Sequence, residues 1–241
     1  MCLVSFVPQK NGFILSSNRD ETPLRSVCNL QSVQIGKVQV MYPSDKLGGT
    51  WLAVSNRGDV LCLLNGAFVK HKHSPPYAMS RGIVLLSFFK YSGVPDFVTN
   101  FNFGGVEPFT LVIFSEMCLY EFRWDGLTKH LIPLSTNQAH VYSSCTLYTD
   151  EVQAERKLWF NNYLLNKPSL CLSDVQHMHR IGGPKNIENA YLMNRNNTVK
   201  TISVSHVNAN FEEKKIGLYY EDIHNNSGEV CPLSMDLIGT R

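Results

Sequence analysis

The sequence contains few charged residues and almost no net charge. Asp, Glu, Lys and Arg make up 17% of the 241 residues, and 22 basic residues against 20 acidic ones leave a formal charge of +2. Binding to nucleic acid or to an anionic membrane is driven by surplus positive charge, which this chain lacks. We therefore expect no nucleic-acid partner. The 44% of hydrophobic residues argues at the same time against a disordered chain.

Long apolar segments and closely paired cysteines are also missing. The longest apolar runs, residues 3–7 and 83–89, fall far short of the roughly 18 residues of a membrane-spanning helix, and no basic stretch precedes the first run as in a secretion signal. The 7 cysteines are widely spaced and include no C-x-x-C pair, which excludes the usual zinc and redox motifs. We expect a soluble protein with free thiols in a reducing compartment, the cytoplasm.

Apolar segments separated by turn-forming residues predict a mixture of strands and helices. Ser80 is expected to cap the first helix, and Asp150 with Gln153 to form a capping box on the second. The order of the elements favours an α+β fold with mainly antiparallel sheets, in one domain over residues 1–241. The expected ranges are strands at 2–7, 13–17, 33–41 (one strand or a pair of strands), 51–55, 60–65, 109–114, 118–124, 188–193, 198–207 and 215–223, and helices at 80–91, 150–166 and 173–180.

Cys2 is the residue that most clearly suggests chemistry. Met1 is commonly removed when the second residue is small, and its removal would leave a chain that begins with a thiol and a free α-amine. Because such an amine has a pKa of about 7.7–8.0, it can act as the base for its own nucleophile. The alternative interpretation of Cys2 is an ordinary strand residue.

Four polar residues, Asn18-Arg19-Asp20-Glu21, follow the second predicted strand. An Asn-Gly turn between the first two strands predicts a hairpin that brings these residues back towards Cys2. A nearby arginine would lower the pKa of the Cys2 thiol, and a carboxylate could hold the α-amine in place. A solvated loop is the alternative interpretation of this segment.

Met1-Cys2 followed by the Asn-Arg-Asp-Glu segment resembles the NRDE family, also called the transport and Golgi organisation family. The family is similar to the N-terminal nucleophile hydrolases, especially the bile-salt and penicillin V acylases. This resemblance implies a four-layer αββα sandwich, with two mainly antiparallel sheets between helix layers. Further matching segments follow in order over about 200 residues: GGTWLAV at 48–54, Asn65 at a strand end, Ser80-Arg81-Gly82, FTLV at 109–112 and RNNTV at 195–199.

The resemblance also implies a set of catalytic residues. Cys2 would be the nucleophile, with its own amine as the base. Arg19 and Asp20 would orient and polarise that end of the chain. Asn65 would help to form the oxyanion hole, and Arg195 would position Asp20 or the substrate. Three further residues are predicted to bind the substrate: Asn18, Glu21 and Trp51.

Three features depart from the family pattern, one of which is Asn194 in place of the family's Thr before the late Arg. Arg19 and Asp20 are adjacent, so on a regular strand their side chains point to opposite faces, and both reach Cys2 only if the strand ends or bulges there. Cys145 stands where the family's GLSN segment supplies another Asn. Because a thiol is a weak hydrogen-bond donor, an oxyanion donor would be lost if that Asn has this role.

Two functions of different classes remain open. The first is a cysteine amidohydrolase that acts on the linear amide of a small, partly apolar substrate. The second is a non-catalytic binding or trafficking protein on the same scaffold, holding haem or an acyl lipid in an apolar pocket. No His or Met stands out as an axial ligand for haem. The oligomeric state does not follow from the sequence.

Two His-x-His pairs are weaker candidates, for a metal site. His71 and His73 lie in a predicted loop, and His177 and His179 lie in a predicted helix, where residues two apart diverge. We therefore expect neither a metal nor another cofactor.

Overall fold

The structure is a computed structural model that describes residues 2–25, 27–45, 48–167, 169–183 and 185–236, with residues 2, 27 and 28 described by their backbone alone. Within these ranges the chain forms two seven-stranded antiparallel sheets, A and B. Sheet A contains, from edge to edge, β10 (His140–Ser143), β1 (Cys2–Gln9), β2 (Gly12–Glu21), β12 (Val199–Asn210), β13 (Lys215–Asp222) and β14 (Ser227–Ser234), with β11 (Asn194–Arg195) paired to β12. Sheet B contains β3 (Val27–Ile35), β4 (Val38–Asp45), β5 (Leu52–Ser55), β6 (Val60–Asn65), β7 (Phe109–Ser115), β8 (Cys118–Trp124) and β9 (Lys129–Leu134).

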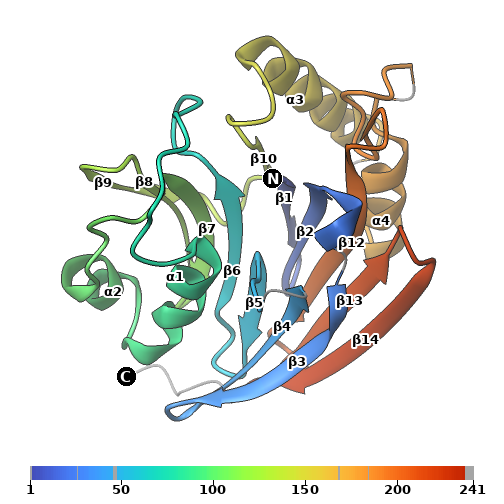
Figure 1. The fold of residues 1–241 in the computed structure, drawn as a ribbon. Coiled ribbons are helices and arrows are strands. Elements are labelled where there is room, and N and C mark those ends of the chain that lie inside the picture. Colours follow the sequence, from blue (N-terminus) through green and yellow to red (C-terminus); the bar gives the residue numbers. More distant parts are fainter. Residues whose placement is uncertain (1, 26, 46–47, 168, 184, 237–241) are drawn as a thin grey trace.

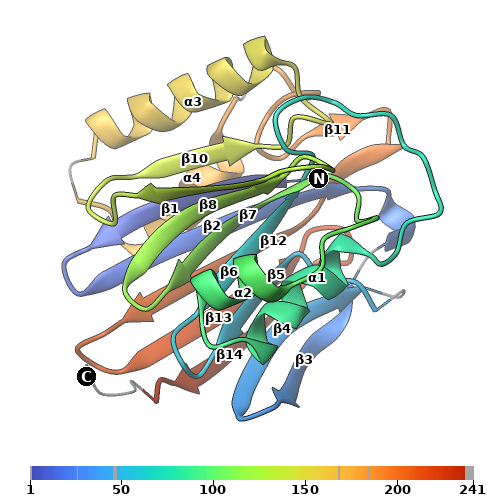
Figure 2. The same ribbon diagram turned by 90° about the vertical axis from the view of Figure 1, so that its left-hand side faces the viewer.

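The two sheets stack face to face, and helices cover their outer faces (Figure 1). On sheet B lie α1 (Arg81–Ser87) and α2 (Val94–Asn100), and on sheet A lie α3 (Asp150–Leu165) and α4 (Leu172–Ile181). Two short 3₁₀ turns complete the elements, at Pro23–Arg25 and Phe88–Lys90. Figure 2 shows α3 running alongside β10 at the edge of sheet A. The predicted α+β fold and four-layer αββα sandwich are confirmed. None of the helices in the described ranges has the length and apolar character needed to span a bilayer.

Strand β2 shows why neither face of a central strand is exposed to solvent. Phe13 and Leu15 point into the core between the sheets, whereas Ile14 packs under the helices of sheet A. Successive side chains of a strand alternate between its two faces, and both faces of β2 are covered. Residues 13–20 are consequently buried without interruption, and Arg19 and Asp20 are buried with them.

The first hairpin differs in detail from the predicted Asn-Gly turn. The turn consists of Lys10 and Asn11, and Gly12 already begins β2. A side chain at this position is excluded, because a Cβ on Gly12 would lie 1.8 Å from the carbonyl oxygen of Ala209 in the neighbouring strand. The glycine is therefore required by the close approach of β12, and it lets β2 pair with both of its neighbours.

Helices α1, α3 and α4 agree with the predicted ones, apart from their ends. Ser80 caps α1 as expected, accepting a hydrogen bond of 3.3 Å from the Ile83 N–H. The α-helix ends at Ser87, and a 3₁₀ turn follows in place of the predicted continuation to residue 91. The cap of α3 is Thr149 rather than Asp150, because Thr149 is the last residue with extended backbone, and its Oγ1 accepts from Val152 N at 3.5 Å.

The strand predicted at residues 188–193 is wrong. Residues 186–190 form turns closed by hydrogen bonds to the Asn186 carbonyl, and only the two-residue β11 follows. The apolar pattern that suggested a strand comes from Tyr191 and Met193, which are buried in the irregular segment before β11. Prolines interrupt the patterns of three elements that were not predicted: β9 with Pro133, β14 with Pro232, and α2 with Pro95. The four-residue strand β10 was not predicted either.

Candidate active site at the start of the first strand

The start of β1 lies between β2 and β10. In the antiparallel ladder, the Cα of Cys2 is paired with that of Arg19 on one side. On the other side, Leu3 is paired with Ser143, the last residue of β10. The Cys2 side chain lies outside the described part of the chain. The register thus brings Arg19, rather than Asp20, directly opposite Cys2.

Arg19 is held on the face of sheet A that looks towards sheet B. Its Nη2 donates to Asp45 Oδ2 at 2.8 Å, and its guanidinium stacks over the Trp51 ring at 4.1 Å. Asp45 also accepts from Arg25 Nη2 at 2.6 Å and from the Gly49 N–H at 2.9 Å. Burial raises the pKa of Asp45, but these hydrogen bonds and charges outweigh it, and its net pKa is lowered. Arg19 therefore faces a carboxylate that is ionised at neutral pH.

Asp20 is held on the opposite face, under the helices. It is fully buried, and its two oxygens accept hydrogen bonds of 2.6 Å from Tyr148 Oη and Thr201 Oγ1. Burial raises its pKa, and the charge of Arg156 offsets this only in part. The irregularity at this point of the ladder falls in β12, between Thr201 and Ser203, whereas β2 itself continues to Glu21. Arg19 and Asp20 consequently diverge.

Two arginines support Tyr148, the partner of Asp20. Arg156 is fully buried, lies 3.8 Å over the Tyr148 ring and donates through Nε to the Asn189 carbonyl at 3.1 Å. Arg195 lies 5.3 Å from the same ring centre and donates to Asn189 Oδ1 at 2.7 Å. Arg195 thus adjoins Asp20 through Tyr148, on the helix side of the sheet.

The three residues predicted to bind substrate lie in three different places. Asn18 is buried beneath α4, where its Nδ2 donates to the carbonyls of His179 and Tyr191 at 3.0 and 2.8 Å. Glu21 ends β2 and accepts from Arg25 Nη1 at 3.2 Å. Trp51 is the platform under Arg19. Of the three, Trp51 lies on the same side of sheet A as the Arg19 side chain. That these residues contact a substrate stays a prediction.

Asn65 and Cys145 lie together, as the sequence match suggests. The Asn65 carbonyl accepts a 2.7 Å hydrogen bond from Ser144 Oγ and lies 4.0 Å from Cys145 Sγ. These contacts join the end of β6 in sheet B to the segment after β10 in sheet A. Gly66 has φ +81°, and a Cβ there would lie 2.5 Å from Cys145 Sγ. Burial raises the pKa of the Cys145 thiol, so it remains protonated and weak as a donor.

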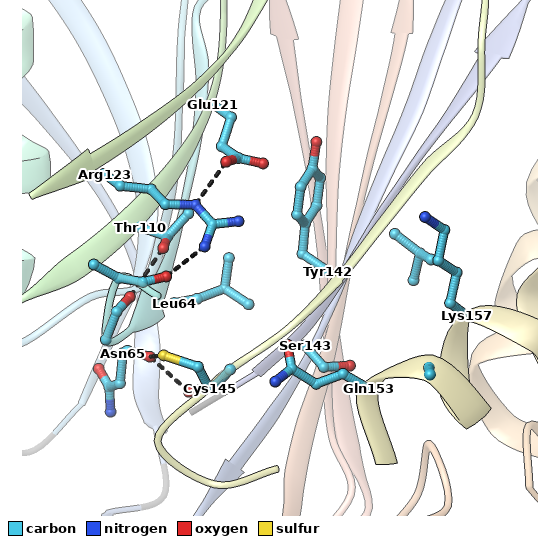
Figure 3. Close-up of a pocket in the computed structure, with 15 residues that line it drawn as sticks. Leu64, Asn65, Thr110, Glu121, Arg123, Tyr142, Ser143, Cys145, Gln153 and Lys157 are labelled. Atoms are coloured by element: carbon cyan, nitrogen blue, oxygen red, sulfur yellow. Dashed lines mark hydrogen bonds and ion pairs between the residues drawn. The ribbon is translucent and has the colours of Figure 1, made fainter. Parts of the chain in front are cut away.

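A pocket of about 340 Å³ opens beside these residues, between β6–β8 on one side and β10 with α3 on the other (Figure 3). Glu121 and Arg123 lie on the sheet B side, Lys157 lies on the helix side, and the Tyr142 ring stands between them. A second pocket of about 410 Å³, formed by residues 68–70 and 145–151, shares Cys145 with the first.

Four residues of these networks were not found from the sequence: Asp45, Tyr148, Arg156 and Thr201. Each one holds Arg19 or Asp20, or supports a residue that does, and each comes from a segment far away in the chain. No local pattern distinguishes them, because only the pairing of the sheets brings them to β2. The single available signal was the pair of charges in β2 itself, since buried charges require partners.

The first histidine pair shares a carboxylate, and the second is divided between the interior and the surface. His71 Nε2 and His73 Nδ1 both approach Glu107 Oε1, at 2.9 and 3.0 Å. In α4, His179 is buried while His177 is exposed. In the described ranges, no three His, Cys, Asp or Glu residues are grouped so that they could hold a metal ion.

Comparisons with known proteins agree with this fold. The model of the family "Transport and Golgi organisation 2" matches residues 1–158. No curated protein matches the chain. Two variants of the conjugated bile acid hydrolase from Clostridium perfringens align over 100% of this chain and 95% of their own, with TM-score 0.58 and 12% identity. Penicillin V acylase from Agrobacterium tumefaciens aligns over 98% of this chain and 86% of its own, with TM-score 0.54 and 13% identity. At such identities the likeness concerns the fold.

Proposed function

The chain belongs to the Transport and Golgi organisation 2 family and has the fold of N-terminal nucleophile hydrolases, and from this premise we propose that it is a cysteine amidohydrolase acting on linear amides. The observation that carries the proposal is the register that pairs Cys2 with Arg19 at the start of β1. Removal of Met1 would make Cys2 the N-terminal residue there, beside a buried guanidinium.

The proposed reaction uses the thiol and the α-amine of Cys2 as one unit. The amine takes the thiol proton, and the thiolate attacks the amide carbonyl to form a tetrahedral oxyanion. When this intermediate collapses, the C–N bond breaks and the ammonium gives its proton to the leaving amine. Water, deprotonated by the same amine, then attacks the thioester, which releases the acid and restores the thiol.

The residues around β2 would support this chemistry from both faces of the sheet. Arg19 favours the thiolate, although its pairing with Asp45 weakens the effect compared with a lone guanidinium. Asp20, clamped by Tyr148 and Thr201, would fix the strand end and the amine from the helix side. Asn65 would donate to the oxyanion, a contact that is typically worth about 10²–10³ in rate.

A non-catalytic binding protein on the same scaffold is the second candidate. It is favoured by Cys145, whose protonated thiol is a poor substitute for an amide donor beside Asn65. The haem or acyl-lipid version of this candidate has no support from the pockets, because the pocket beside Asn65 contains Glu121, Arg123 and Lys157. Burying such charges against an apolar ligand would be costly.

Intact-mass measurement and thiol labelling test the proposal. We expect a purified protein without Met1, and labelling of Cys2 by iodoacetamide at neutral pH that is lost in Cys2→Ala. The matched control is Cys171→Ala, which removes an exposed free thiol and leaves labelling of Cys2 unchanged. Retained Met1 would rule out the mechanism, because it blocks the amine. Hydrolysis of an amide panel by the wild type but not by Cys2→Ala would separate the enzyme from the binding protein.

A further inference from the structure

The pocket beside Asn65 has an unusual distribution of charge. Two cations, Arg123 and Lys157, and one acid, Glu121, belong to its lining, which leaves one positive charge in excess. Glu121 is buried, and its Oε1 accepts from Arg123 Nε at 2.6 Å. The acid of the pocket is therefore already neutralised, and the remaining charge is the ammonium of Lys157.

Several donors of the pocket are left without a partner. Lys157 forms no ion pair with any residue that the structure describes, and it lies on the α3 side of the pocket (Figure 3). Arg123 uses Nη1 to bind the Ala67 carbonyl at 2.5 Å and stacks on Phe68 at 4.8 Å, while its Nη2 has no hydrogen bond within the described ranges. These atoms can donate to a ligand at no cost to an existing contact.

Tyr142 stands between the two cations as a third donor. Burial raises the pKa of its phenol, and the nearby Glu121 raises it further, so the hydroxyl keeps its proton at neutral pH. It makes no hydrogen bond to another described residue. A ring flanked by two cationic groups, with its O–H free, suits an acceptor-rich, negatively charged ligand. A cationic ligand is disfavoured by the excess positive charge.

We propose that this pocket binds a small molecule through a carboxylate, with Lys157 as the counter-ion and Tyr142 and Arg123 as hydrogen-bond donors. The volume of about 340 Å³ falls within the usual range for small-molecule pockets, about 300–1,000 Å³. The pocket also reaches Asn65 and Ser144, next to the β10 residue that pairs with Leu3. That the ligand is a substrate, with its amide directed at Cys2, rests on the proposed function, whereas its binding does not.

Equilibrium binding to the Cys2→Ala protein tests the proposal without turnover. The probes are N-acetylphenylalanine, which carries a carboxylate, and N-acetylphenylalaninamide, which has the same shape without the charge. We expect the acid to bind at least about tenfold more tightly than the amide, because a charged hydrogen bond contributes about 1.5–3 kcal/mol. Lys157→Met should remove this preference, and Lys157→Arg should restore most of it.

The control is Lys37→Met, which removes an exposed lysine in the turn between β3 and β4 and should leave both affinities unchanged. Equal binding of acid and amide, or no binding of either, would overturn the proposal. Phenyl phosphate is the third probe, and tighter binding of this compound than of the acid would make the pocket a phosphate site instead. If the acid binds but the wild type hydrolyses no amide, the carboxylate site stands and the proposed reaction fails.

Discussion

At the end of β2, the two faces of sheet A hold the adjacent residues Arg19 and Asp20 by different kinds of interaction. On the face towards sheet B, Arg19 is paired with Asp45, whose carboxyl pKa is lowered by its hydrogen bonds and charges. On the helix face, Asp20 is held by two hydroxyls, and burial raises its pKa. An ion pair holds Arg19 on one face, and two hydroxyl groups hold Asp20 on the other. Substitutions and changes of pH should therefore affect the stability contributed by the two faces differently.

The largest effect is expected on the helix face, from Arg156→Met. This guanidinium is fully buried, and its removal leaves the Asn189 carbonyl without its donor and the Tyr148 ring without its cation. Breaking a buried charged network typically costs about 3–5 kcal/mol of unfolding free energy. Urea denaturation should show this loss. Lys157→Met, at the next and exposed position of α3, should change stability little, and a similar loss there would contradict the explanation.

The next effect is expected on the face towards sheet B, from Asp45→Asn. The amide keeps the shape but removes the negative charge beside the buried Arg19, which should cost about 3 kcal/mol. Stability at pH 7 is the measurement, and Glu213→Gln, an exposed acid paired with Lys215, is the control. A loss below about 1 kcal/mol would show that Arg19 does not depend on this carboxylate. Iodoacetamide labelling of Cys2 in the same variant would report whether a less neutralised Arg19 increases thiol reactivity.

The contrast between the faces also shows what could be predicted from sequence. Alternation along β2 predicts that Arg19 and Asp20 diverge, and this was found, because the periodicity of a strand is a local property. The partners Asp45, Tyr148 and Thr201 could not be predicted, since they come from other strands and loops whose pairing the local pattern does not encode. The strand predicted at 188–193 failed for the same reason: burial of Tyr191 and Met193 in an irregular segment produces the same apolar pattern as a strand.

A moderate effect of pH is expected from His206, a further residue of sheet A that faces the helices. Burial lowers its pKa to about 3, and its Nδ1 lies 2.7 Å from Ser16 Oγ, while the ring contacts His179 at 5.7 Å. The unfolded chain binds a proton near pH 6.5 and the folded one does not. Stability is therefore complete above pH 6.5 and falls below it, by up to about 1.4 kcal/mol per pH unit for one such group.

Denaturation of His206→Gln at pH 7.5, 6.5 and 5.5 checks this expectation. The variant should lose stability less steeply than the wild type on acidification, whereas His177→Gln, an exposed histidine of α4, should follow the wild type. Parallel curves for all three proteins would show that His206 is protonated equally in the folded and unfolded chains.

The smallest effect is expected from Trp51→Phe, which weakens the stacking under Arg19. The lost cation–π contact is worth about 0.5–1 kcal/mol. The substitution also removes the buried Trp51 Nε1, which has no hydrogen-bond partner among the described residues, and such an unpaired donor costs about 1–3 kcal/mol. The two terms oppose each other, so stability measured by urea denaturation should change by less than about 1 kcal/mol. A loss as large as that of Asp45→Asn would mean that the Trp51 indole contributes as much as the carboxylate to holding Arg19 on this face.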